Sequence, residues 1–275
     1  MTERLGLIAG SGRLPFEVAE AAKRHGTALS IVAIQDNTDP RIEAVPCDAF
    51  TWICAGELGR LLEFLKKSRA TEVILAGAVA KQELFRDPAR LKPDARAIAL
   101  LTRLKDLGDD ALLRAVAQEI ESEGMTVVDS TRHLHDRLTP SGPLIDVSIS
   151  ESVQRDLALG MRVAKTLGIH DVGQTVIVKD ATVLALEAIE GTNAAIERGA
   201  QLGGAGVSIV KAAKPQQDLR FDVPAIGTDT LALAERLGVA AIGLEVGRTI
   251  LLERDLVLRR ALAAHIAIVG LDVEP

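Results

Sequence analysis

The first 130 residues alternate short apolar runs with helical stretches, and this pattern constrains the fold more than any other feature of the chain. The apolar runs are RLGLIAG, LSIVAI, EVILAG and MTVVDS. Helical patterns lie between them, over residues 14–25, 58–67, 97–104 and 109–123. Strands that alternate with helices are joined by right-handed crossovers and form a parallel sheet covered by helices. We therefore predict an α/β fold that begins with a Rossmann-like nucleotide-binding domain over residues 1–130.

The pattern changes after residue 130. Residues 131–150, TRHLHDRLTPSGPLIDVSIS, are rich in turn formers and predict a linker. A helical pattern follows, and then two β-rich runs separated by Lys179 and Asp180, which indicate a hairpin. Residues 240–253 suggest a second hairpin, and HIAIVGL a terminal strand. We expect a C-terminal α+β domain over residues 151–275.

Composition excludes several classes of protein. The net charge of -6 and an aromatic content of 2% without Tyr argue against nucleic acid as a partner. Cys47 and Cys54 form no pattern typical of a disulfide framework or a zinc site. The sequence shows neither a signal-peptide layout nor an apolar run long enough to span a bilayer. We expect a cytoplasmic protein.

Glycine-rich turns follow two of the predicted strands in the first domain. Such turns let the backbone approach a phosphate, and the helix N-terminus after the first turn favours an anion. The dinucleotide fingerprint has a third glycine where this chain has Pro15, so a simple tight turn is the alternative. The two turns would lie side by side at the ligand edge of the sheet. The candidate substrate-binding residues here are Gly10, Ser11, Gly12, Leu14, Pro15, Gly77 and Ala78.

Two glutamates lie near the end of a predicted strand in the second domain, in TVLALEAIEGT. Strand alternation places Glu187 on the same face as Ile189 and other apolar residues. A carboxylate on such a face requires a partner, and buried charge often marks a functional site. Glu190 and Thr192 lie where the next helix begins. Either glutamate could instead be purely structural, and we take Glu187, Glu190 and Thr192 as candidates.

The segment KAAKPQQDLRFDVPAIG, residues 211–227, fits neither a strand nor a helix. Its cations and amides suit phosphate, and its two carboxylates could hold a divalent cation or activate water. Metal-assisted attack on a phosphate ester or anhydride needs this combination. A solvated loop with internal salt bridges is the alternative. The candidate residues are Lys211, Lys214, Gln217, Asp218, Arg220 and Asp222.

These segments resemble a known family. LGLIAGSGRLP, GDDALLR, GQTVIVKDATVLALEAIEGT and above all KAAKPQQDLRFDVPAIG are similar to blocks of the UDP-2,3-diacylglucosamine pyrophosphatases of the LpxI type. Within GDDALLR, the resemblance adds Gly108 and Asp109 as substrate-binding candidates, although capping of a helix by Asp109 or Asp110 is the better explanation of the acids from the residues alone.

The resemblance implies a reaction, a cofactor and an assembly. The reaction is hydrolysis of UDP-2,3-diacylglucosamine to UMP and 2,3-diacylglucosamine 1-phosphate (lipid X), in lipid A biosynthesis, with Mg²⁺ or Mn²⁺. It further implies a homodimer and two domains that close over the substrate, with residues 151–275 as the domain that carries catalysis and binds the acylated sugar. Asp222 would have an important catalytic role. Transient contact with the inner membrane surface is left open. The family's EGTD block reads EGTN here, so we assign Asn193 no metal-binding role.

The sequence therefore supports a metal-assisted hydrolase in which Asp222 ligates the metal or orients water, with Glu187 or Asp218 assisting. A sugar-nucleotide-binding or sensing protein without turnover is the alternative. Carboxylates beside phosphate favour the enzyme, because a simple polyanion binder gains nothing from them.

Overall fold

The computed structural model describes residues 3–79, 92–104, 109–221 and 223–273, and for residues 109–111 the backbone alone. The chain divides into two compact units. The N-terminal unit comprises Met1–Leu134 together with Leu219–Asp222, and the C-terminal unit comprises His135–Asp218 and Val223–Pro275. Each unit is described by itself below. A short piece of the segment 211–227 thus belongs with the N-terminal unit.

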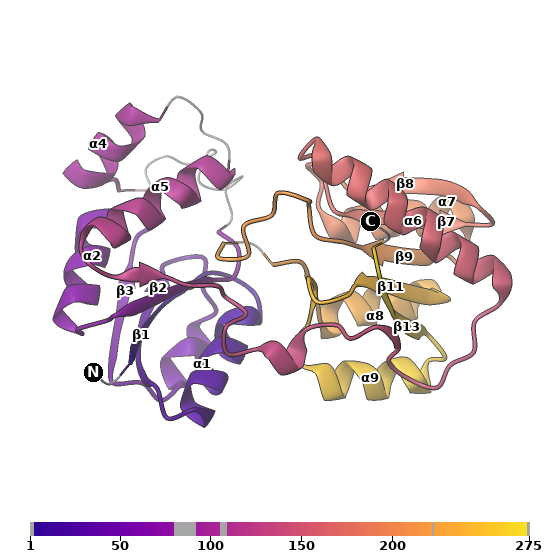
Figure 1. Ribbon diagram of the computed structural model, residues 1–275, viewed down its shortest axis with the longest axis horizontal. Coiled ribbons are helices and arrows are strands. Elements are labelled where there is room, and N and C mark those ends of the chain that lie inside the picture. The colour runs from indigo at the N-terminus through magenta and orange to yellow at the C-terminus, as the bar shows by residue number, and fades with distance from the viewer. Residues whose placement is uncertain (1–2, 80–91, 105–108, 222, 274–275) are drawn as a thin grey trace. The chain divides into compact units, whose positions relative to one another are not determined.

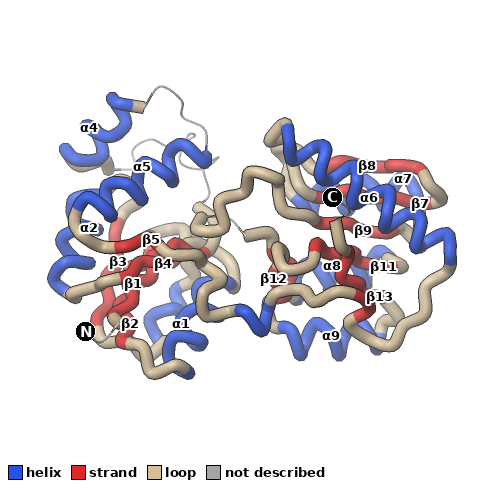
Figure 2. The backbone as a smooth tube through the Cα atoms, in the orientation of Figure 1, coloured by secondary structure: helices blue, strands red, loops and turns tan. Residues whose placement is uncertain are grey.

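The N-terminal unit is built on a five-stranded parallel sheet of order β3-β2-β1-β4-β5 (Figures 1 and 2). This is the predicted Rossmann-like arrangement, which is confirmed. The sequence analysis missed β3, because AFTWI is only half-buried and lacks a long apolar run. The strands are β1 (Arg4–Ala9), β2 (Ala28–Ile34), β3 (Ala49–Ile53), β4 (Glu72–Ala76) and β5 (Thr126–Val127).

Helices cover both faces of this sheet. Helix α1 (Leu14–Arg24) packs against β1, β2 and β4. On the other face, α2 (Leu58–Lys67), α4 (Ala95–Arg103) and α5 (Asp109–Ser122) share one core with apolar side chains of the strands. Phe221 is buried in the same core, and Ser130 donates two hydrogen bonds to the carbonyl oxygen of Leu219, at 3.3 and 3.0 Å. Residues 219–221 are therefore packed parts of the N-terminal unit.

The C-terminal unit contains a mixed six-stranded sheet of order β6-β13-β11-β9-β7-β8, and β10 and β12 form a small parallel sheet. In the large sheet, β9, β11 and β13 are mutually parallel, whereas β7 runs antiparallel to both its neighbours. The strands are β6 (Gly142–Pro143), β7 (Thr175–Lys179), β8 (Thr182–Leu186), β9 (Ser208–Lys211), β10 (Ala225–Ile226), β11 (Ala241–Glu245), β12 (Ile250–Leu251) and β13 (Ala267–Leu271).

This sheet is also covered on both faces. Helix α6 (Glu151–Ile169) packs on one face through Leu157, Met161 and Ala164. Side chains of α7 (Thr192–Gly203), α8 (Thr228–Leu237) and α9 (Arg254–Ala263) belong to the core on the other face. Among the helices within the described ranges, none combines the length and apolarity that crossing a lipid bilayer requires.

One of the two predicted hairpins is confirmed and the other is wrong. Strands β7 and β8 pair antiparallel, and Asp180 and Ala181 take positive φ angles of 49° and 58° in the turn between them. Strands β11 and β12, in contrast, belong to different sheets. The reason is that β11 lies between β9 and β13, so both its edges are already hydrogen-bonded and β12 pairs with β10 instead.

The register of the large sheet brings three strand ends to one edge. Thr175 of β7 pairs with Lys211 of β9, and Lys211 lies beside Leu244 of β11. The amide of Glu187, the residue after β8, donates to the carbonyl oxygen of Thr175 at 2.9 Å. Glu187, Lys211 and Glu245 thus follow one another along the carboxyl edge of β8, β9 and β11. We call this the carboxyl edge of the C-terminal unit.

Candidate active site

Thr192 connects two buried charged side chains at the carboxyl edge of the C-terminal unit. Its hydroxyl donates to Oε1 of Glu187 at 2.7 Å and accepts from Nζ of Lys211 at 3.1 Å. Glu187 is 8% exposed and Lys211 7%. Oε2 of Glu187 is buried and has no hydrogen-bond partner within the described part of the chain. These three side chains therefore present one carboxylate oxygen of Glu187, able to accept a hydrogen bond, close to the ammonium of Lys211 that Thr192 binds.

The local sequence explains why Glu187 lies there. Strand β8 ends at Leu186, and Gly191, with φ of 84°, makes the turn into α7, which begins at Thr192. The positive end of a helix dipole stabilises a carboxylate near its N-terminus. Gly173 leaves room for this turn, since a Cβ there would lie 2.0 Å from the carbonyl oxygen of Glu187.

The same early end of β8 corrects one expectation. Ile189 does not share a buried face with Glu187, because strand alternation stops at Leu186 and Ile189 is 87% exposed. Glu190 is ion-paired with Arg198 at 2.5 Å. The pKa of Glu190 is lowered, first by a hydrogen bond from its own backbone N–H and then by Arg198. Glu190 therefore lies close to Thr192 in sequence but has its own cation.

A buried ion pair supports the next strand end. Nζ of Lys165, on α6, lies 2.9 Å from Oε1 and 3.1 Å from Oε2 of Glu245. The same ammonium donates to the carbonyl oxygen of Ala213 at 2.8 Å, and Oε2 of Glu245 accepts from the amide of Ala213 at 2.7 Å. Both backbone groups of Ala213 are thus held by this pair, directly after β9. The sequence analysis missed Lys165 and Glu245, although AAIGLE ends an apolar run with a carboxylate just as TVLALE does.

The residues after Ala213 contact the C-terminal end of α6 and the residues just beyond it. The amide of Lys214 donates to the side-chain oxygen of Gln217 at 3.0 Å, and the ammonium of Lys214 is ion-paired with Asp171. The side-chain nitrogen of Gln216 donates to the carbonyl oxygen of Gly168 at 2.9 Å. Residues 212–217 are therefore fixed to the end of α6. Asp218 is half-buried.

Of the remaining predicted residues of this segment, one belongs to the N-terminal unit and one lies outside the described residues. Arg220 belongs to the N-terminal unit, where its guanidinium lies 3.4 Å from Glu121 and 4.9 Å from the ring centroid of Phe221. Asp222 lies outside the described residues. Its role as catalytic residue and metal ligand stays a prediction. Gly108, a predicted substrate-binding residue, also lies outside the described residues. Asp109 is the first residue of α5, and its side chain is not described.

The two glycine turns of the N-terminal unit do lie side by side. The amide of Gly10 donates to the carbonyl oxygen of Ala76, and the amide of Ser11 to that of Ala78, both at 2.7 Å. A Cβ on Gly77 would lie 2.3 Å from the carbonyl oxygen of Ser11, so this contact requires glycine. Leu14 and Pro15 begin α1 and are buried.

A polar hollow adjoins these turns. It is lined by Gly12, Trp52 and residues 35–40. Gly12 has a φ of 87°, and a Cβ there would point into open space. Hydrogen bonds from the side chain and then the backbone N–H of Arg41 lower the pKa of Asp39 to about 2. The hollow therefore has polar walls and a carboxylate that stays charged at neutral pH.

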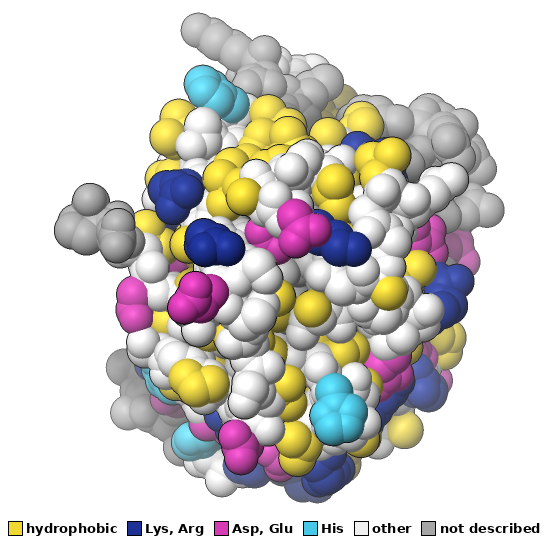
Figure 3. Space-filling view, turned by 90° about the vertical axis from the view of Figure 1, so that its right-hand side faces the viewer, with side chains coloured by type: hydrophobic (Ala, Val, Ile, Leu, Met, Phe, Trp, Pro, Cys, Tyr) yellow, Lys and Arg dark blue, Asp and Glu magenta, His cyan; other side chains and the backbone are white. Residues whose placement is uncertain are grey.

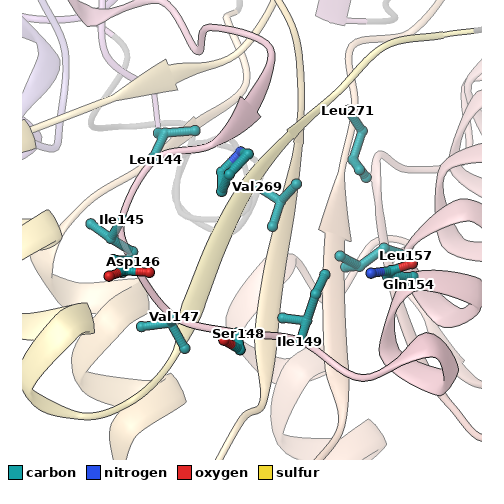
Figure 4. Close-up of a pocket in the computed structure, with 11 residues that line it drawn as sticks. Leu144, Ile145, Asp146, Val147, Ser148, Ile149, Gln154, Leu157, Val269 and Leu271 are labelled. Atoms are coloured by element: carbon teal, nitrogen blue, oxygen red, sulfur yellow. The ribbon is translucent and has the colours of Figure 1, made fainter.

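Three further observations bear on the site. Within residues 3–79, 92–104, 109–221 and 223–273, no three His, Cys, Asp or Glu side chains gather as a metal-binding group. A second hollow of about 870 Å³ in the C-terminal unit lies between residues 143–149, β13 and the start of α6 (Figure 4). None of the predicted site residues lines it. On the face drawn in Figure 3, acidic and basic side chains are interspersed rather than gathered by sign.

Family models and a named relative match nearly the whole chain. Residues 4–137 match the LpxI N-terminal domain and residues 140–269 the LpxI C-terminal domain. A protein of Caulobacter vibrioides, named UDP-2,3-diacylglucosamine pyrophosphatase LpxI, is 34% identical over 281 residues and covers 98% of each chain. Among solved structures, the biotin carboxylase domain of Hydrogenobacter thermophilus 2-oxoglutarate carboxylase covers 66% of this chain and 36% of its own, at 14% identity and a TM-score of 0.26. Biotin carboxylase of Campylobacter jejuni covers 73% and 42%, at 13% identity and a TM-score of 0.24.

Proposed function

Because this chain belongs to the LpxI family, we propose that it is a UDP-2,3-diacylglucosamine pyrophosphatase. It hydrolyses a phosphoric anhydride and releases UMP and 2,3-diacylglucosamine 1-phosphate. The observation that carries this proposal is 34% identity to the named relative over 98% of both chains. A match of that extent includes both units of the chain.

The carboxyl edge of the C-terminal unit supplies groups suited to this reaction. Lys211 is buried, and its ammonium donates a hydrogen bond to the hydroxyl of Thr192. A cation in such a weakly solvated site offsets the negative charge that develops on phosphate oxygens. Oε2 of Glu187 is an acceptor that can orient a water molecule. Thr192 fixes both side chains, since its proton goes to Glu187 and its lone pair accepts from Lys211.

A divalent cation is the second part of the proposal. Mg²⁺ in phosphate-handling sites is bound through one or two carboxylates and the substrate's own phosphates. Asp222, the metal ligand predicted from the sequence, lies outside the described residues. When bound, Mg²⁺ or Mn²⁺ would neutralise phosphate charge. A homodimer remains a prediction from the family resemblance, and a cytoplasmic location remains a prediction from the composition. Transient contact with the inner membrane surface stays open.

The test is incubation of the purified full chain with UDP-2,3-diacylglucosamine in buffer with Mg²⁺, followed by mass spectrometry of the products. We expect UMP and 2,3-diacylglucosamine 1-phosphate in equal amounts. Binding without product would favour the non-catalytic sugar-nucleotide-binding protein instead. Addition of excess chelator should stop the reaction, and full activity in chelator would remove the metal from the proposal.

A further inference from the structure

The N-terminal unit contains an apolar cavity of about 190 Å³ that the proposed reaction does not explain. Its floor is formed by the ends of four adjacent strands, with Ile8 of β1, Ile34 of β2, Ile53 of β3 and Leu75 of β4. Its walls come from α2, α4 and α5, where Ala97 of α4 faces the cavity. The cavity thus lies at the carboxyl edge of the parallel sheet, where doubly wound folds bind their ligands.

The three wall helices are tied to one another, so the cavity is preformed. Asp94, which caps α4, accepts from the amide of Gly59 in α2 at 2.6 Å. Arg96 of α4 pairs with Glu119 of α5 at 2.7 Å and with Glu123, just beyond α5, at 2.5 Å. These polar contacts lie between the helices and leave their apolar side chains directed at the cavity.

The residues that line the cavity favour an apolar ligand. Glu57 is the one charged residue among the described residues that line the cavity, and its carboxylate accepts from the amide of Cys54 at 2.6 Å. The other side chains that the described residues contribute to the lining are hydrocarbon. The polar hollow lined by Gly12, Trp52 and residues 35–40 belongs to the same sheet. One edge of this sheet therefore offers a polar site and a separate apolar one.

We propose that this cavity binds the hydrocarbon of a fatty acyl chain. The inference rests on the proposed function, in which the substrate carries two acyl chains. It differs from the expectation that the C-terminal domain alone holds the acylated sugar, because the apolar cavity belongs to the N-terminal unit. Hydrocarbon binding there is driven by burial of apolar surface and needs no hydrogen bond.

The first experiment measures kcat/KM for substrates of increasing acyl length with the full chain and the variant Ala97→Phe. Each methylene that the cavity buries should raise kcat/KM by about four-fold in the wild type, since it contributes about 0.8 kcal/mol. A phenyl ring in the cavity should abolish that gain for the longest chains. The matched control is Ala99→Phe, on the exposed side of the same helix, which should keep the wild-type dependence.

The second experiment is independent of turnover. Isothermal titration with octan-1-ol, a neutral hydrocarbon probe, should show binding to the wild type and to Ala99→Phe, and at least ten-fold weaker binding to Ala97→Phe. If Ala97→Phe does not fold, Ala97→Leu replaces it, with a smaller but same-signed effect. Equal octan-1-ol binding by all variants would overturn the inference even in an active enzyme. Selective binding without any hydrolysis would support the cavity assignment and refute the proposed function.

Discussion

Removal of Glu245 from its pair with Lys165 tests how the C-terminal unit supports its carboxyl edge. The carboxylate is buried, and it holds both the ammonium of Lys165 and the amide of Ala213. In Glu245→Leu, Lys165, whose side chain is 17% exposed, becomes a largely buried charge without its counter-ion, which costs up to about 3 to 5 kcal/mol. The unpaired amide of Ala213 adds about 1 to 3 kcal/mol if water cannot reach it.

Activity should fall as well, because Ala213 begins the segment that carries Lys214, Gln217 and the residues up to Asp222. A displacement of about 1 Å in groups that position a substrate can cost roughly 100-fold in rate. We therefore expect Glu245→Leu to lower both the melting temperature of the C-terminal unit and kcat/KM, measured by calorimetry and by product formation. The matched control is Arg236→Met, which breaks the exposed pair with Glu197 and should cost less than about 1 kcal/mol.

The double variant Lys165→Met with Glu245→Leu gives the decisive comparison. If the damage comes from an uncompensated buried charge, the double variant should be more stable than Glu245→Leu alone, since it removes that charge. Strict additivity of the two single losses would refute this reasoning.

Three other predictions follow from particular side chains. Asp222→Ala should abolish turnover and leave substrate binding largely intact, and a wild-type rate in a steady-state assay would refute its catalytic role. Thr192→Val should lower kcat at least ten-fold while Thr192→Ser restores most of it, because the hydroxyl connects Glu187 to Lys211 and serine keeps it; equal kcat for both variants would contradict this. A hydrogen bond from the Cys54 amide, and then Arg60, lowers the pKa of Glu57 below 4.5, so its contribution to stability is present above that pH and lost as pH falls through the lowered pKa. Glu57→Gln should therefore melt below the wild type near neutral pH, with the difference shrinking as the pH falls through the lowered pKa of Glu57. A difference independent of pH would argue against ionisation as the cause.

The sequence predicts most of the fold because its strongest signals are local. Apolar runs that end in glycine identified β1 and β4 and their adjacent turns, and the contact at Gly77 needs the absence of a side chain. The half-buried β3 has no comparable signal. The pairing of β11 and β12 depends on which edges are already occupied in three dimensions, and adjacent sequence does not contain that information.

For the candidate site, too, local features were predictable from the sequence, whereas contacts between distant residues were not. Burial of Glu187 follows from an acid at the end of an apolar run, but its partner Thr192 depends on where β8 ends and α7 begins. The ion pair of Lys165 and Glu245 joins residues 80 positions apart, so spacing alone could not predict it. Nor could spacing show that Arg220 packs in one unit while Lys211 and Lys214 lie in the other.

The most direct test of a hydrolytic site at the carboxyl edge of the C-terminal unit is the turnover number of Glu187→Gln toward UDP-2,3-diacylglucosamine. This change keeps the size of the side chain and an oxygen that can accept from Thr192, and it removes the charge. We predict that kcat falls by about 100-fold or more while the melting temperature changes little. A Glu187→Gln protein that turns over at the wild-type rate would contradict the account.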